Sequence, residues 1–161
     1  MEILTSGMSG AFIHLAAAAA LALVQGQPHV TDGDTIRIVE TRISLEGIDA
    51  LEMSQQSTKA DGSDWKCGEA AKAALIQKIG DEAVRCEISG ADSYGRSLGT
   101  CWIGKLNLNG WLAQAGWAVA YRRYSMRYAS EEQYAHGKHL NIWSGGFEAP
   151  SDYRARQGRG R

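Results

Sequence analysis

The feature that most constrains the fold is a set of short alternating segments joined by turn residues. Residues 27–31 and 35–39 flank the turn Asp32-Gly33-Asp34, and residues 42–48 alternate in the same way, with Ile43 and Leu45 on one face. Alternation with a period of two, bounded by glycine and aspartate, is typical of β-hairpins. The pattern predicts three consecutive strands that bury one face.

The rest of the chain combines a second hairpin with helices. Residues 84–88 and 98–103 flank the turn Asp92-Ser93-Tyr94-Gly95-Arg96, and a short strand is expected at 118–121. Apolar spacing predicts helices at 68–79, 108–115 and 129–139, whereas residues 53–65 are polar and aperiodic and predict a mobile surface loop. This order of strands and helices indicates an α+β fold whose strands suit a small Greek-key barrel.

The N-terminal segment predicts export. Residues 11–24 are almost wholly apolar, too short a run to span a bilayer comfortably, and Ala20-Leu21-Ala22 offers an A-x-A cleavage site. Against export, the first ten residues contain Glu2 and no Lys or Arg. We expect a signal peptide at 1–24 and a periplasmic or secreted protein, with an uncleaved anchor or a buried N-terminal helix as alternatives.

Beyond this segment the chain predicts one domain, at 25–150. The whole chain has 161 residues, of which 44% are hydrophobic, enough for a single core. No proline-rich or charged linker divides it. The net charge of −1 hides a separation, because residues 25–93 carry 7 Lys/Arg against 13 Asp/Glu and residues 94–161 carry 10 against 4. Acidic residues in the first part of the chain and basic residues in the second suit a metal site that faces a polyanion. Two separate solvated surfaces, one acidic and one basic, would give the same counts. Residues 151–161 carry four arginines without apolar periodicity and predict a disordered basic tail.

Three cysteines are too few for a disulfide scaffold and lack the spacing of a zinc site. Cys86 and Cys101 lie at similar distances from the centre of the second hairpin, so a disulfide between them is possible in an oxidising compartment. Two buried free thiols are the alternative. Cys67 is left over in both cases.

Candidate chemistry begins with the carboxylates of Asp34, Asp49 and Glu52, which lie at or just beyond predicted strand ends. Hard oxygen ligands favour Ca²⁺ or Mg²⁺, although each aspartate alone is also a common turn residue. Arg96 offers a guanidinium fork for a phosphate, or is a solvated turn residue. Tyr94 and Tyr124 offer aromatic faces for a base or ribose, or are packing residues.

Several of these motifs, taken in order, resemble the thermonucleases, also called staphylococcal nuclease-like proteins. The matching segments are Val30-Thr31-Asp32-Gly33-Asp34-Thr35, Leu45-Glu46-Gly47-Ile48-Asp49-Ala50-Leu51-Glu52, Asp92-Ser93-Tyr94-Gly95-Arg96, Asn109, Gly116-Trp117-Ala118 and Asn141-Ile142-Trp143-Ser144. The resemblance covers nearly the whole chain after residue 24. It implies a five-stranded OB-fold Greek-key β-barrel with three helices.

The same resemblance implies a calcium-dependent nuclease that cleaves DNA or RNA at the 5′ oxygen. Asp34, Asp49 and the Ala50 carbonyl would bind Ca²⁺, and Asp32 would support them. Glu52 would be the general base and Arg96 would bind the phosphate. Tyr94, Tyr124 and Ser44 would line the substrate site.

Two positions depart from the family pattern. Ser44 stands where the family carries a second phosphate-binding arginine, and the loss of such a donor costs about 3 to 4 kcal/mol of transition-state stabilisation. Arg42, on the same strand face, is expected to compensate in part as a catalytic cation. Leu51 replaces a proline, which loosens the loop that aims Glu52.

Two functions follow from these features. The first is a metal-dependent nuclease acting on single- or double-stranded nucleic acid as a monomer, without a stable protein partner, and away from any membrane unless the N-terminal segment is uncleaved. The second is a catalytically inactive OB-fold module that binds nucleic acid or another polyanion. Ser44 is the residue that separates them.

Overall fold

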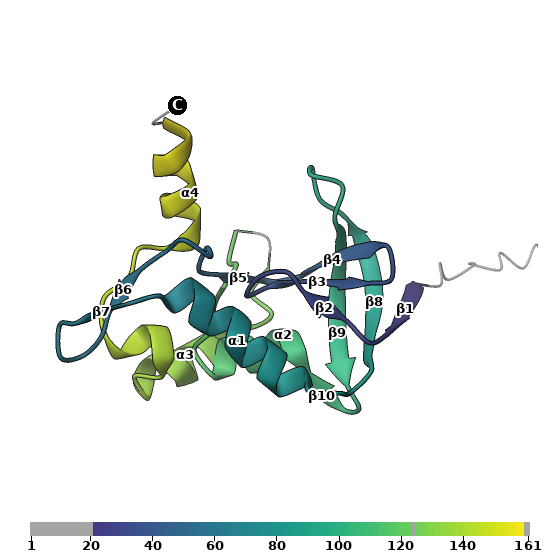
Figure 1. Cartoon of the computed structure of the whole chain (residues 1–161), viewed down its shortest axis with the longest axis horizontal. Coiled ribbons are helices and arrows are strands. Elements are labelled where there is room, and N and C mark those ends of the chain that lie inside the picture. Colours follow the sequence, from purple (N-terminus) through teal and green to yellow (C-terminus); the bar gives the residue numbers. More distant parts are fainter. Residues whose placement is uncertain (1–20, 124, 160–161) are drawn as a thin grey trace, which may run out of the picture.

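The computed structural model describes residues 21–123 and 125–159 and shows a curled β-sheet with helices packed at one end (Figure 1). The strands are β1 (Ala22–Gly26), β2 (His29–Val30), β3 (Thr35–Ile38), β4 (Thr41–Leu45), β5 (Ile48–Ala50), β6 (Ser57–Thr58), β7 (Asp64–Trp65), β8 (Val84–Ala91), β9 (Ser97–Ile103), β10 (Leu106–Asn107) and β11 (Ala118–Ala120). The helices are α1 (Cys67–Ile79), α2 (Leu108–Gln114), α3 (Ala129–Gly137), the 3₁₀ turn η1 (Asn141–Ser144) and α4 (Pro150–Arg159).

The main sheet has the order β1-β8-β9-β4-β3-β2, with β10 paired to β9. Neighbouring strands are antiparallel except β4 and β9, which pair in parallel and bring the two predicted hairpins together. The predicted alternation is confirmed, because Ile36, Ile38, Ile43 and Leu45 are all buried. A slip of one residue would turn these side chains toward solvent, so burial fixes the register.

The helix predicted at 68–79 is α1, and it packs Ala71, Leu75 and Ile79 into the core at intervals of four residues. Gly80, at φ 55°, ends this helix, as expected for a residue without Cβ. The α+β architecture of the OB type is therefore confirmed. The strand count is larger than the expected five, since short edge strands bring the main sheet to seven strands.

The N-terminal prediction falls mostly outside the described residues, which begin at residue 21. Residues Ala22–Gly26, however, form β1 and pair with β8 in antiparallel register. The sheet thus includes residues 22–24, which the sequence pattern assigned to the signal segment. An apolar run is compatible with an edge strand as well as with a signal segment. None of the helices within 21–123 and 125–159 has the length and apolar character needed to cross a membrane.

Two segments predicted to lack regular structure are ordered. Residues 53–65 contain the small hairpin of β6 and β7, which is held against the region after η1 by a hydrogen bond of 2.8 Å from the Thr58 amide to the Gly146 carbonyl. The basic tail forms helix α4, so the prediction of disorder at 151–161 is wrong for residues 151–159. Arg154 of this helix pairs with the distant residues Asp49 and Glu52, and tail composition alone does not reveal these contacts.

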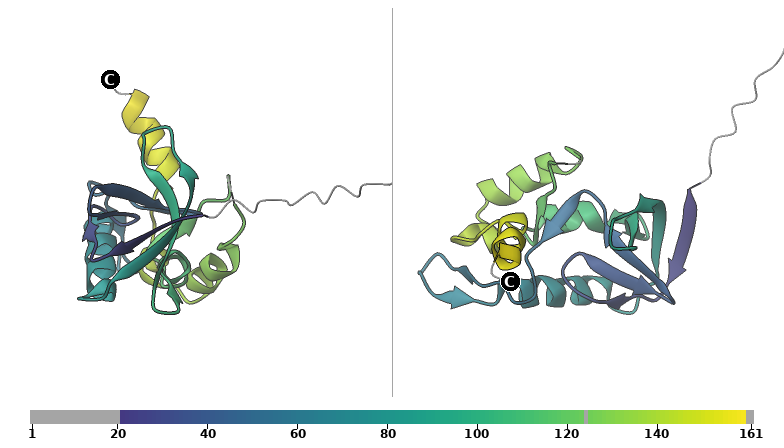
Figure 2. Two further views of the ribbon diagram at one scale, coloured as in Figure 1. Left: turned by 90° about the vertical axis from the view of Figure 1, so that its right-hand side faces the viewer. Right: turned by 90° about the horizontal axis from the view of Figure 1, so that it is seen from above.

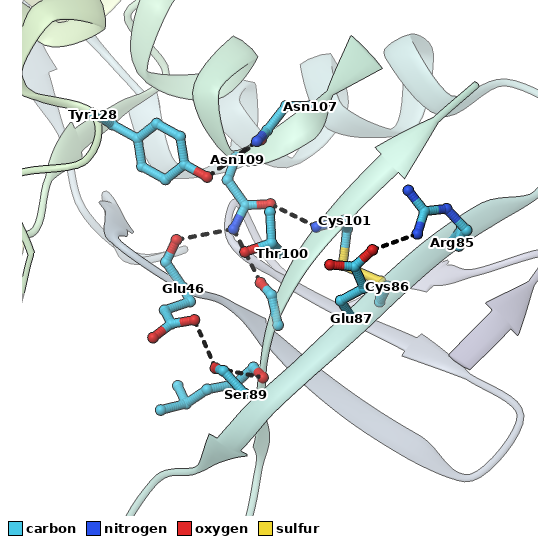
Figure 3. Close-up of a disulfide and its surroundings, with 12 residues drawn as sticks. Glu46, Arg85, Cys86, Glu87, Ser89, Thr100, Cys101, Asn107, Asn109 and Tyr128 are labelled. Carbon is cyan, nitrogen blue, oxygen red and sulfur yellow. Dashed lines mark hydrogen bonds and ion pairs between the residues drawn. A yellow bond between two sulfur atoms is a disulfide. The ribbon is translucent and has the colours of Figure 1, made fainter. Parts of the chain in front are cut away.

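The second hairpin carries a disulfide between Cys86 of β8 and Cys101 of β9, which face each other in register (Figure 3). The alternative of two free thiols is therefore wrong. Export remains a prediction, which the disulfide supports because such bonds persist in oxidising compartments. Cys67 stays a free, buried thiol, and burial raises its pKa.

The disulfide is expected to contribute substantially to stability. It closes a loop with a sequence separation of 15, and closing a loop of this size in the unfolded chain is worth about 3 kcal/mol. The double variant Cys86→Ser/Cys101→Ser should lower the free energy of unfolding by about that amount in urea denaturation. Replacing Cys67 alone with Ser tests for a general effect of removing sulfur. An unchanged midpoint for the double variant would contradict the prediction.

Candidate functional site

Asp34 is the last residue of the first turn, and its side chain faces β5. Gly33 makes this approach possible, because a Cβ there would lie 2.8 Å from the Cβ of Ala50. Oδ2 of Asp34 accepts a hydrogen bond of 2.7 Å from the Ala50 amide, and Oδ1 accepts one of 3.2 Å from the Thr35 hydroxyl. Asp32 stabilises the turn by accepting from the Asp34 amide at 3.2 Å. The turn thus joins the start of β3 to the end of β5.

Asp49 lies on β5, opposite Val119 of β11, and its side chain is 9% exposed. Glu52 follows the strand with a side chain that is 38% exposed. The Glu52 backbone is fixed by contact with the start of α1, where a Cβ on Gly68 would lie 1.9 Å from the Glu52 carbonyl oxygen. One buried carboxylate and one accessible carboxylate therefore lie side by side on the same segment.

The chain around Glu52 is held without the family's proline. Leu51 is 1% exposed and packs with Cys67 and Ile142 in a small apolar cluster. The amide of Glu52 donates to Oε1 of buried Gln55 at 3.1 Å, and the Gln55 amide donates to the Glu52 carbonyl at 2.8 Å. Side-chain burial and these hydrogen bonds restrict the backbone at the position where the family has proline, which opposes the loosening expected from Leu51.

Arg96 points from the tip of the β8–β9 hairpin toward Asp34. Its Nε donates to Asp92 Oδ2 at 2.6 Å, and its Nη1 donates to the Thr35 hydroxyl at 3.3 Å. The same hydroxyl donates to Asp34, so Thr35 connects the guanidinium to the carboxylate. A charge-assisted hydrogen bond to Asp92 fixes the direction of the arginine.

Strand β4 and the tip of the β8–β9 hairpin carry three of the other predicted site residues. Ser44 lies on β4 directly opposite Thr35, and Arg42 lies two residues earlier, opposite Arg37. Arg42 is therefore two residue pairs further along the ladder from Thr35 than Ser44 is, and it is exposed. Tyr94 is 84% exposed with the Arg96 guanidinium 5.9 Å from its ring centre. Tyr124 lies outside the described residues.

Arg154 of α4 is the site residue that the sequence did not reveal. Its Nη1 donates to Asp49 Oδ1 at 2.9 Å and to Glu52 Oε1 at 2.7 Å, and its Nη2 donates to Asp49 Oδ2 at 2.8 Å. Helix α4 and the tip of the β8–β9 hairpin project from the same side of the molecule (Figures 1 and 2). The cluster of arginines in the tail was the available signal, but composition does not reveal its partners.

The carboxylates form one electrostatic unit. Burial, and then repulsion from Asp32 and Asp49, raises the pKa of Asp34 to about 8, although the hydrogen bond from Ala50 opposes this shift. Crowded carboxylates of this kind fit a divalent cation, which would offset their mutual repulsion. Over the described ranges, no three His, Cys, Asp or Glu side chains are already arranged to hold a metal ion. Asp49 instead directs both oxygens at Arg154.

Comparisons with known proteins identify the family of this chain. The family model described as staphylococcal nuclease homologue matches residues 42–145. The chain is 38% identical over 122 residues to succinoglycan biosynthesis protein ExoI of Rhizobium meliloti (strain 1021), covering 73% of this chain and 63% of the relative, which is less than two thirds of its length. It is 32% identical to Protein ParB of Escherichia coli, with 81% of this chain and 84% of the relative covered.

A third relative carries the name of the family that the motifs resemble. The thermonuclease of Staphylococcus intermedius is 31% identical over 125 residues, covering 71% of this chain and 72% of the relative. The family match includes Asp49 of β5, Glu52 just after this strand and Arg96 in the turn between β8 and β9. The chain belongs to the staphylococcal nuclease homologue family.

Proposed function

We propose that this protein is a calcium-dependent nuclease that hydrolyses phosphodiester bonds of DNA or RNA. The observation that carries the proposal is the joining of distant residues into one network. Asp34 contacts the backbone beside Asp49 and reaches Arg96 through Thr35, while one guanidinium bridges Asp49 and Glu52. Carboxylates beside a directed arginine are the groups that phosphodiester hydrolysis requires.

Each residue then has a distinct role. Asp34, Asp49 and the Ala50 carbonyl would hold the cation, with Asp32 stabilising the turn that carries Asp34. Glu52 is accessible enough to take a proton from water, and Arg96 would stabilise the negative charge that develops on the phosphate. A bound calcium ion would supply positive charge beside the scissile phosphate. Arg42 remains a candidate for a second phosphate contact.

A non-catalytic module that binds nucleic acid or another polyanion is the second candidate. Two observations favour it: Ser44 brings no charge to the position opposite Thr35, and Arg154 engages the carboxylates that catalysis would need free. An OB-type barrel binds single strands without chemistry in other proteins. Activity measurements separate the two candidates.

The test is digestion of plasmid and heat-denatured DNA with Ca²⁺ or with EGTA. The nuclease proposal expects cleavage that EGTA abolishes. Ser44→Arg should raise the rate about 10- to 100-fold, because it adds a guanidinium where transition-state charge can be stabilised. Ser44→Lys is the matched control, since it adds charge without the bidentate fork. Parent protein that binds DNA without cutting it, together with a cleaving Ser44→Arg variant, would favour the binding module.

A further inference from the structure

We propose that Arg154 is an internal cation that competes with the divalent metal ion for Asp49 and also pairs with the neighbouring Glu52, so that α4 regulates metal binding at this site. The inference rests on the proposed function in that it takes Asp49 as part of a cation site. It goes beyond that function by giving the C-terminal helix a regulatory role. A residue 105 positions from Asp49 in sequence thereby controls access to it.

The first argument is the completeness of the contact. The planar fork of Arg154 engages both oxygens of Asp49, at 2.8 and 2.9 Å, in a bidentate pair. The same guanidinium also reaches Oε1 of Glu52 at 2.7 Å. Carboxylate oxygens are the ligands that calcium takes from proteins. Arg154 and the metal ion would thus require the same oxygen atoms of Asp49.

The second argument is charge. A guanidinium and a divalent cation that share a carboxylate repel each other, and Asp49 is too buried for solvent to screen this repulsion fully. Binding of the metal ion should therefore displace Arg154, and docking of Arg154 should weaken the metal ion. Such coupling is reciprocal by thermodynamic necessity.

The third argument is that few contacts other than those of Arg154 hold α4 at the site. Pro150 is buried, but residues 151, 152 and 154–158 are exposed and Tyr153 is half-buried. Beyond Arg154, the helix contacts the site segment through a hydrogen bond of 2.9 Å between the hydroxyls of Tyr153 and Ser54. Few apolar contacts would be lost on release, and regions of this kind open readily.

The start of the helix would stay attached during release. The side-chain amide of buried Gln55 donates to the Glu148 carbonyl at 2.6 Å, just before α4 begins. Gly145 packs against the β6 strand so closely that a Cβ would lie 1.9 Å from the Thr58 carbonyl oxygen. The helix is therefore anchored at its N-terminal end, and its position beside β5 allows Arg154 to return (Figure 1).

The test is calcium titration by calorimetry of the full chain and of Arg154→Gln, at one ionic strength. Loss of the competing charge-assisted pair should tighten calcium binding roughly tenfold. Arg154→Lys should tighten it less, because lysine keeps the charge and loses the bidentate fork. Arg156→Gln is the matched control: it removes the same charge from the same helix, but Arg156 pairs with Glu148 at 2.8 Å and contacts neither carboxylate.

A second measurement follows the helix itself. Hydrogen exchange of residues 150–159 in the unmodified protein should become faster on addition of calcium, because the displaced helix loses its contacts. Equal or weaker calcium binding by Arg154→Gln, or unchanged exchange at saturating calcium, would overturn this inference alone. Absence of calcium binding in every protein tested would overturn the proposed function as well.

Discussion

Glu52→Gln is expected to lower the rate of DNA cleavage roughly 10²- to 10⁴-fold, the range over which a positioned general base contributes. Glutamine matches glutamate in shape, and its amide oxygen can still accept the hydrogen bond that Arg154 now donates to Oε1 at 2.7 Å. The change therefore removes the ability to take a proton and little else. Initial rates on denatured DNA at saturating calcium measure the effect.

The control for this variant is Glu69→Gln. Glu69 lies in the first turn of α1, where its exposed carboxylate pairs with Lys66 at 3.1 Å. Exposed pairs of this type contribute about 0 to 1 kcal/mol to stability, so the control should keep both its fold and its activity. A Glu52→Gln protein that cleaves at the parental rate would remove Glu52 from the role of base.

Asn109→Ala is expected to lower the free energy of unfolding by about 3 to 5 kcal/mol. Asn109 is fully buried at the start of α2 and connects three backbone groups (Figure 3). Its Oδ1 accepts from the Cys101 amide at 3.0 Å, and its Nδ2 donates to the carbonyls of Glu46 and Gly99 at 2.9 and 3.0 Å. Alanine would leave these buried polar groups without partners.

Asn107→Ala is the matched comparison, two residues away. Its side chain accepts from the Gly110 amide at 2.9 Å and caps α2, and the loss of such a cap costs typically about 1 kcal/mol. Urea denaturation of both variants would separate a helix cap from a cross-link between strands. Equal destabilisation would show that Asn109 acts only through its helix.

Local order in this protein follows from the sequence wherever near neighbours decide the structure. Alternation placed β3 and β4, spacing of four residues placed α1, and the similar distances of Cys86 and Cys101 from a turn indicated their pairing. The candidate carboxylates and Arg96 were singled out by short motifs and by their resemblance to a known family.

The order of the C-terminal tail could not be predicted in this way. A segment with many arginines and no apolar periodicity is typical of disorder, since it buries too little apolar surface to offset the loss of chain entropy. Ion pairs from Arg154 to Asp49 and Glu52 contribute to its order as α4. Strand β1 could not be predicted from local sequence either, because it forms by pairing with the outer edge of β8.

The sequence by itself determined the strands of the two predicted hairpins and the main helices, because these depend on periodicity and on local turn chemistry. The acidic residues of the site were singled out by motifs that resemble a known family. Only the tertiary structure decided which cation faces that site. Arg154 and Asp49 are 105 residues apart, and their contact arises from the path of the whole chain around the barrel. Sequence periodicity does not predict such a contact. A bidentate ion pair requires two groups to meet in space, but it requires no particular separation between them in the sequence.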